Sequence, residues 1–96
     1  MHHDSPKHVL ETIGNTPLMT IDKLSSGPIL GKAEFLNPGG SIKDRISKFI
    51  LDRAEERGEL TEGSVIVEAS SGNTGIGMTL VGLQKGYRVI IVMPEN

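Results

Sequence analysis

The 96-residue sequence contains no cysteine and no tryptophan, and its aromatic residues are two phenylalanines and one tyrosine. The lack of cysteine excludes disulfides, thiol nucleophiles and cysteine-based metal sites. With so few aromatic residues, any core must consist mainly of Ile, Leu, Val and Met. The net charge is −2 and the pI is about 5.9. No basic stripe is visible, so neither nucleic acid nor an anionic membrane is a predicted partner.

Long apolar runs are also absent, so no transmembrane segment is predicted. The first residues lack the apolar stretch of a signal peptide, and we therefore expect a cytoplasmic protein. Residues 1–8 are predicted to be a flexible N-terminus. His2 and His3 are neighbours in that tail, and no metal site is predicted from them. The length allows one domain or a part of one.

Glycine, proline and small polar residues divide the remaining chain into short helices and strands. The nearly continuous apolar run at 88–93 is typical of a parallel strand that is covered on both faces. Together with the strand and helix before it, this run predicts a βαβ unit. The predicted elements are, in order, a short helix around 8–12, strands at 18–21 and 29–35, a helix at 42–57, a strand at 65–69, a helix that follows the loop at 70–75 and ends near 85, and a strand at 88–93.

Residues 37–45 read Asn-Pro-Gly-Gly-Ser-Ile-Lys-Asp-Arg, which predicts a sharp loop followed by a helix. Ser41 is the predicted N-cap, and Asp44 stands three residues later in the position of a capping box. Gly58 is predicted to end the helix. Apolar residues recur with helical spacing along one stripe, at Ile42, Ile46, Phe49, Ile50 and Ala54.

Lys43 lies in the first turn of this predicted helix. The partial positive charge at a helix N-terminus disfavours an ammonium group there. Together with burial, it favours the neutral and nucleophilic amine. A neutral amine is what Schiff-base chemistry on a carbonyl cofactor requires. A solvated lysine, or one that braces the loop, is the alternative interpretation of this residue taken alone.

Residues 70–75 read Ser-Ser-Gly-Asn-Thr-Gly between a predicted strand and a predicted helix. Free N–H groups at a helix N-terminus bind phosphate or carboxylate, so an anion site is predicted here. The alternative is a capped helix in which Gly75, Gly77 and Gly82 only permit close packing, at a cost of roughly 1 kcal/mol each relative to alanine. The same glycines, with Glu95 further on, partly match a dinucleotide fingerprint, although their spacing differs from the usual one.

Four strings occur in a characteristic order: 13–18 (Ile-Gly-Asn-Thr-Pro-Leu), 37–45, 70–75, and Gly86-Tyr87 leading into Met93-Pro94-Glu95. Together they resemble the beginning of the cysteine synthase and cystathionine β-synthase family of pyridoxal-phosphate enzymes. The resemblance implies an α/β fold of type II, tryptophan synthase β-like, with βαβ units and a parallel sheet. Residues 9–96 would form its N-terminal part, truncated before the loop that binds the cofactor phosphate.

The resemblance also implies roles for individual residues. Lys43 would carry pyridoxal 5′-phosphate as an internal aldimine and then remove the α-proton of the substrate. Asn73 would donate a hydrogen bond to the ring oxygen of the cofactor. The substrate carboxylate would be bound by Ser70, Ser71, Gly72, Asn73 and Thr74, where Ser70 replaces the threonine that is usual in the family.

The implied reaction is a β-replacement that passes through an aminoacrylate. The amino acid substrate would be O-acetylserine, O-phosphoserine or serine, and the nucleophile would be sulfide or a thiol. The Gly39-Gly40 pair and residues 75–77 are closer to the cystathionine synthases than to the acetylserine enzymes. A homodimer is implied for the full-length protein.

Three interpretations follow for the chain. The first is a piece of such an enzyme, which we expect to be inactive alone because the family's phosphate loop is not among its residues. The second is part of a Rossmann-type oxidoreductase that binds a dinucleotide. The third is a non-catalytic interaction module that uses the same fold.

Overall fold

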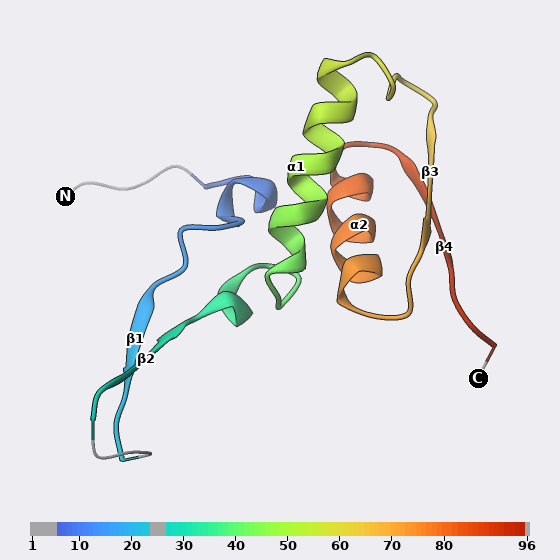
Figure 1. The fold of residues 1–96 in the computed structure, drawn as a ribbon. Coiled ribbons are helices and arrows are strands. Elements are labelled where there is room, and N and C mark those ends of the chain that lie inside the picture. Colours follow the sequence, from blue (N-terminus) through green and yellow to red (C-terminus); the bar gives the residue numbers. More distant parts are fainter. Residues whose placement is uncertain (1–5, 24–26, 96) are drawn as a thin grey trace.

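The computed structural model describes residues 6–23 and 27–95 (Figure 1). Most of the predicted flexible tail, with His2 and His3, lies outside the described residues, as do two serines of the turn before Gly27. In chain order, the elements are η1 (Val9–Thr12), β1 (Leu18–Ile21), β2 (Ile29–Lys32), η2 (Glu34–Leu36), α1 (Lys43–Glu56), β3 (Val65–Ala69), α2 (Asn73–Gln84) and β4 (Arg88–Val92).

The C-terminal half is a βαβ unit, as predicted. Strands β3 and β4 pair in parallel, in a register that runs from Val65 opposite Arg88 to Ala69 opposite Val92. Helix α2 connects them and lies between this sheet and α1 in Figure 1. The N-terminal strands β1 and β2 form a separate antiparallel pair.

The core lies where α2 meets α1 and the parallel strands. Val81 is fully buried and packs with Leu51, Ile66, Met78 and Tyr87. Gly82 has no room for a side chain, because an added β-carbon would lie 2.6 Å from a methyl carbon of Val89. The predicted close-packing role of a helix glycine is therefore confirmed at this position.

Both long helices end at a glycine, as the sequence predicted. Gly58 and Gly86 have φ values of +76° and +88°, in the left-handed region that favours glycine. After α1, the N–H of Gly58 donates to the carbonyl of Glu55, and the next N–H donates to the carbonyl of Ala54. The equivalent pair of bonds follows α2. These are Schellman motifs, which satisfy carbonyls at the helix end.

A partly buried cation joins the C-terminal ends of the two helices. The Nζ of Lys85 lies 2.6 Å from Oδ1 of Asp52 and 2.5 Å from Oε1 of Glu55, and Lys85 is 13% exposed. Tyr87 donates its hydroxyl to Oε2 of Glu55 at 2.6 Å. The hydrogen bonds from Lys85 and Tyr87 hold the pKa of Glu55 below its ordinary value. This cluster fixes α1 against α2 at the end away from Lys43.

The predicted strand at 29–35 is wrong in its second half. Strand β2 ends at Lys32 because its partner ends too: Lys32 pairs with Leu18, the first residue of β1. The chain then turns into η2, where the N–H of Leu36 donates to the carbonyl of Ala33. Phe35 is therefore helical and not part of the sheet.

The predicted capping box at the start of α1 is also wrong. The helix begins at Lys43, whose N–H donates to Oγ of Ser41 at 3.1 Å. Asp44 does not reach back to Ser41; its carboxylate accepts the N–H of Gly39 instead. The positive φ of Gly40, +89°, curls the loop so that this N–H lies close to Asp44.

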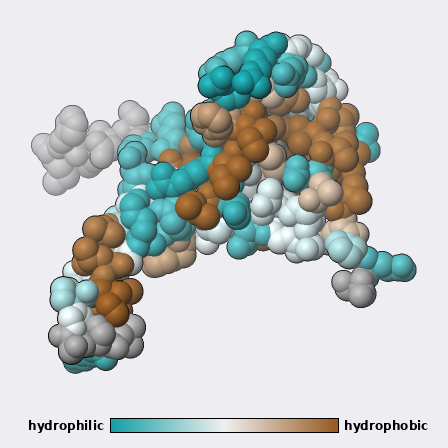
Figure 2. Space-filling view, in the orientation of Figure 1, coloured by the Kyte–Doolittle hydropathy of each residue, from teal (hydrophilic) through white to brown (hydrophobic). Residues whose placement is uncertain are grey.

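Helix α1 leaves its apolar stripe exposed. An amphipathic helix ordinarily buries such a face, but the buried residues of α1 are Asp44, Ser47 and Leu51. Four of its residues are between 41% and 63% exposed, namely Ile42, Ile46, Phe49 and Ile50, and Ala54 is half-buried. Figure 2 shows brown surface over the hairpin of β1 and β2 as well as over the body of the molecule. The radius of gyration of 16.7 Å exceeds the value of about 12.5 Å for a compact chain of this length.

Alanine substitutions test whether the stripe contributes to folding. The double variant Ile46→Ala/Ile50→Ala removes two side chains that are 41% and 45% exposed. We expect the free energy of unfolding to change by less than about 1 kcal/mol and self-association to decrease, because apolar surface is lost. Urea denaturation and light scattering measure the two effects. Leu51→Ala, at a position 4% exposed, is the control and should cost about 2–5 kcal/mol. An equal loss in both variants would contradict the expectation.

Candidate ligand site at the first turns of α1 and α2

A cavity of about 690 Å³ lies between the loop before α1 and the loop before α2. Its size is in the range of small-molecule sites. The loop before α2 follows the carboxyl end of β3, where open α/β sheets bind ligands. The lining residues are Pro38 and Gly39 from the first loop, Ser70, Ser71 and Gly72 from the second, and Gly75, Ile76, Thr79, Leu80, Leu83, Ile91 and Met93 below them.

Ser70 shapes the second loop from within. Its Oγ accepts the N–H of Gly72 at 3.3 Å and the N–H of Gly75 at 2.9 Å. The hydroxyl thus caps the first turn of α2, and its hydrogen is still available to a ligand. Sequence reasoning missed this role because Ser70 lies two residues before the N-cap, Gly72, outside the usual position of a capping serine.

Several N–H groups of the same loop are free. Among the described residues, the backbone N–H groups of Ser71, Asn73 and Thr74 have no hydrogen-bond partner. They belong to the loop and the first turn of α2, where the helix dipole favours negative charge. Their arrangement suits a carboxylate or phosphate group.

Lys43 lies at the start of α1, close to α2. An added β-carbon on Gly77 would lie 2.9 Å from the carbonyl oxygen of Lys43, so the two helices touch near their N-terminal ends. Lys43 is half-buried, and its Nζ has no hydrogen-bond or ion-pair partner within the described ranges. The structure thus brings Lys43 and the 70–75 loop into one region, although Lys43, Asn73 and Thr74 do not themselves line the cavity.

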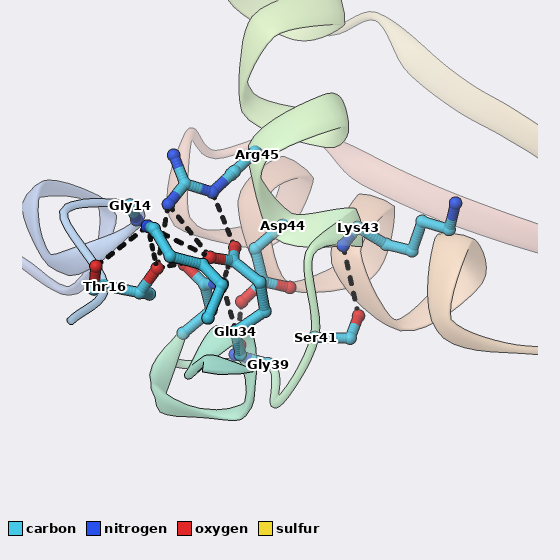
Figure 3. A network of polar contacts seen from close by, with 10 residues as sticks. Gly14, Thr16, Glu34, Gly39, Ser41, Lys43, Asp44 and Arg45 are labelled. Carbon is cyan, nitrogen blue, oxygen red and sulfur yellow. Dashed lines mark hydrogen bonds and ion pairs between the residues drawn. The ribbon is translucent and has the colours of Figure 1, made fainter. Parts of the chain in front are cut away.

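A polar network supports the loop on the other side of Lys43. The carboxylate of Glu34 accepts from Nε of Arg45 at 2.6 Å and from Nη2 at 3.2 Å. It also accepts from the hydroxyl of Thr16 and from Nδ2 of Asn37 at 3.0 Å. The hydrogen bond from Arg45, followed by that from Thr16, lowers the pKa of Glu34 to about 2. Figure 3 shows the Lys43 side chain extending away from these contacts.

This network joins two of the sequence motifs. Oδ1 of Asn37 accepts the N–H of Gly14 at 2.8 Å, and Nζ of Lys32 donates to the carbonyl of Thr16 at 2.8 Å. The string at 13–18 therefore braces the loop that precedes Lys43. Sequence reasoning missed the network, since the only signal was that the two strings occur in the same chain.

Residues 6–23 and 27–95 contain no cluster of three or more potential metal-binding side chains. In the same ranges, no helix has the length and apolar character needed to cross a membrane.

An unpartnered amine, an amide side chain and free N–H groups at a helix terminus form a donor set that fits an aldehyde cofactor and an anionic amino acid. The described structure is an α/β unit in which these groups lie near the N-termini of α1 and α2. The family model described as "Pyridoxal-phosphate dependent enzyme" matches residues 9–96. The chain belongs to this family of pyridoxal-phosphate-dependent enzymes, which favours that interpretation over a dinucleotide site.

The chain is similar to curated proteins named cysteine synthase and cystathionine β-synthase. The chain is 47% identical to cysteine synthase of Dictyostelium discoideum over 99% of its own length and 26% of that protein. It is 50% identical to cystathionine β-synthase of Mus musculus over 96% of its length and 18% of that protein. A hydrogen sulfide-producing enzyme of Fusobacterium nucleatum has a TM-score of 0.91 and 41% identity over 98% of this chain and 32% of that chain. The chain thus spans about a quarter of the first relative.

Proposed function

We propose that this chain forms the lysine-bearing and carboxylate-binding part of a pyridoxal-phosphate-dependent β-replacement enzyme that acts on a serine-derived amino acid. The observation that carries the proposal is the contact between the first turns of α1 and α2. The backbone of Lys43 lies against Gly77 there. The free N–H groups of the 70–75 loop precede Gly77 in the same helix and its loop, which supports a shared site for the Lys43 amine and these donors. The whole protein would take sulfide or a thiol as its second substrate and would act as a homodimer.

Lys43 and Asn73 are the residues that would hold the cofactor. The Lys43 amine would supply the nucleophile for its aldehyde group, and the Asn73 amide would donate to its ring oxygen. When bound, pyridoxal phosphate withdraws electrons from the α-carbon of an attached amino acid. The Lys43 amine would also be the base that accepts the α-proton.

The 70–75 loop would bind the α-carboxylate of the substrate. The free N–H groups of Ser71 and Thr74 are the donors, together with their hydroxyls. Ser70 has a double role, because its oxygen already caps α2 and only its hydrogen can face the ligand. Gly72 leaves open space, since an added β-carbon there would meet no atom within 4 Å. A cysteine synthase and a cystathionine β-synthase match at nearly equal identity, so we propose the shared β-replacement and no single substrate.

A hybrid enzyme tests the proposal. In the Dictyostelium cysteine synthase, the matched segment would be replaced by this chain, which aligns over 99% of its length. The hybrid would be loaded with pyridoxal phosphate, reduced with borohydride and mapped by peptide mass spectrometry. We expect the adduct on Lys43, and we expect Lys43→Ala to abolish both the adduct and β-replacement activity, with a loss of about a thousandfold or more.

Lys48→Ala is the matched control. Lys48 lies on the same helix and pairs with Asp52 at 2.6 Å, away from the cavity. This variant should keep the adduct and most of the activity. An adduct on another lysine of the chain, or full activity of Lys43→Ala, would refute the proposed role.

A further inference from the structure

Asp44 is a fully buried acidic residue next to Lys43 in the first turn of α1. Its Oδ2 accepts the N–H of Gly39 at 2.5 Å. Its Oδ1 is buried and has no hydrogen-bond partner within the described part of the chain. Buried carboxylate oxygens are usually satisfied, so a carboxylate that is held by a single loop N–H needs a specific reason to be there.

The loop is shaped to fit this carboxylate. An added β-carbon on Gly39 would lie 2.3 Å from Oδ1 of Asp44, so no other residue fits without displacing it. The positive φ of the loop belongs to Gly40, not to Gly39. The two adjacent glycines therefore have separate roles: Gly40 makes the turn, and Gly39 allows the close approach.

The contact also fixes two parts of the candidate site. Gly39 and Pro38 form one wall of the cavity. Lys43 precedes Asp44 in the helix, and its N–H is held by Ser41 within the same loop. The helix dipole favours a carboxylate in this first turn. A change at Asp44 would therefore move the cavity wall and the backbone that carries Lys43 together.

We propose that Asp44 is a positioning residue for the Lys43 amine. Its carboxylate holds the N–H of Gly39, and through this bond it sets the wall of the cavity and the point from which Lys43 reaches the cofactor. Asp44 itself is fully buried and does not line the cavity. The role assigned to Lys43 rests on the proposed function, whereas the Asp44–Gly39 contact does not depend on it.

The first test measures the contact in the full 96-residue chain. Asp44→Ala removes the acceptor, whereas Asp44→Asn keeps a carbonyl oxygen that can accept the Gly39 N–H. We expect hydrogen exchange at the Gly39 amide to rise about tenfold or more in Asp44→Ala and to return near its original rate in Asp44→Asn. The amide of the buried Val81 reports global unfolding, so exchange at Gly39 is compared with it in each variant.

The second test uses the hybrid enzyme described above. We expect Asp44→Ala to lower kcat and the borohydride-trapped adduct at Lys43 by about 10- to 100-fold, with a much smaller change in KM, since small displacements of reacting groups have effects of this size. Asp44→Asn should restore most of both. Asp52→Ala is the control, because it removes a carboxylate from the same helix at the Lys85 cluster.

The two tests separate the possible failures. Unchanged exchange at Gly39 in Asp44→Ala would overturn the proposal. So would equal losses of kcat and adduct in Asp44→Ala and Asp52→Ala, because Asp44 would then act only on stability. If the parent hybrid carries no adduct on Lys43, the proposed function fails and the positioning role fails with it, while the exchange test still decides whether the contact exists.

Discussion

Gly77→Ala is expected to lower the free energy of unfolding by about 1–3 kcal/mol, even though alanine is the better helix former. The added methyl carbon would lie 2.6 Å from Oγ of Ser47 and 2.9 Å from the carbonyl oxygen of Lys43. The second of these atoms belongs to the backbone and cannot rotate away, so α1 and α2 must separate. Urea denaturation followed by circular dichroism measures the loss.

Gly75→Ala is the matched control within the same helix. Its added methyl carbon would lie 3.2–3.4 Å from side-chain atoms of Ser70 and Ile91, which can shift slightly. The gain in helix propensity is the same in both variants. We therefore expect Gly75→Ala to cost at least about 1 kcal/mol less than Gly77→Ala, and equal losses would show that the helix contact is not the cause.

The same substitution should disturb the candidate site. Separation of the first turns moves Lys43 relative to the 70–75 loop, which the contact at Gly77 holds together. In the hybrid enzyme, Gly77→Ala should reduce activity more than its loss of stability explains. Under the proposed function, close packing and ligand binding, which were alternative interpretations of this segment, would be combined in one helix.

Local patterns in the sequence predicted the elements whose signals are local. The glycines at 58 and 86 mark helix ends because their positive φ values are a property of the single residue. The apolar strands at 65–69 and 88–93 likewise predicted the parallel pair. The predicted end of the second strand was wrong. The length of β2 depends on the length of its partner, β1, and on the hydrogen bond between Arg45 and Glu34.

Contacts between distant residues could not be predicted in the same way. Nothing in the sequence near Asp44 distinguishes a capping box from a bond to Gly39, since the choice depends on how the loop turns at Gly40. The sequence also did not indicate that the apolar stripe of α1 would be left exposed. Helix α2 packs against the face that carries Ser47 because Gly77 allows closer approach there. The pairing of strings 13–18 and 37–45 required the fold.

Acid should release the network that braces the loop before Lys43. Arg45 and Thr16 lower the pKa of Glu34 from 4.5 to about 2, so the folded chain favours the ionised carboxylate. The resulting stabilisation is complete above about pH 4.5 and is lost as the pH falls toward 2. We expect the hydrogen bond of Arg45 Nε–H, observed by NMR, to break at the lower end of this window, as Glu34 takes up its proton near pH 2.

Glu34→Gln separates this titration from those of other carboxylates. The variant removes the charge that Arg45 faces at 2.6 Å, so it should be less stable at neutral pH. Between pH 4.5 and 2, its free energy of unfolding should also change less than that of the parent chain. The reason is that the variant lacks the proton that Glu34 takes up on unfolding. Glu62→Gln changes an exposed turn residue, and the stability of this variant should depend on pH in the same way as that of the parent chain. If the stability of Glu34→Gln also depends on pH as in the parent chain, the Glu34–Arg45 bond does not stabilise the loop. The placement of Lys43 would then depend on the contacts at Gly39 and Gly77.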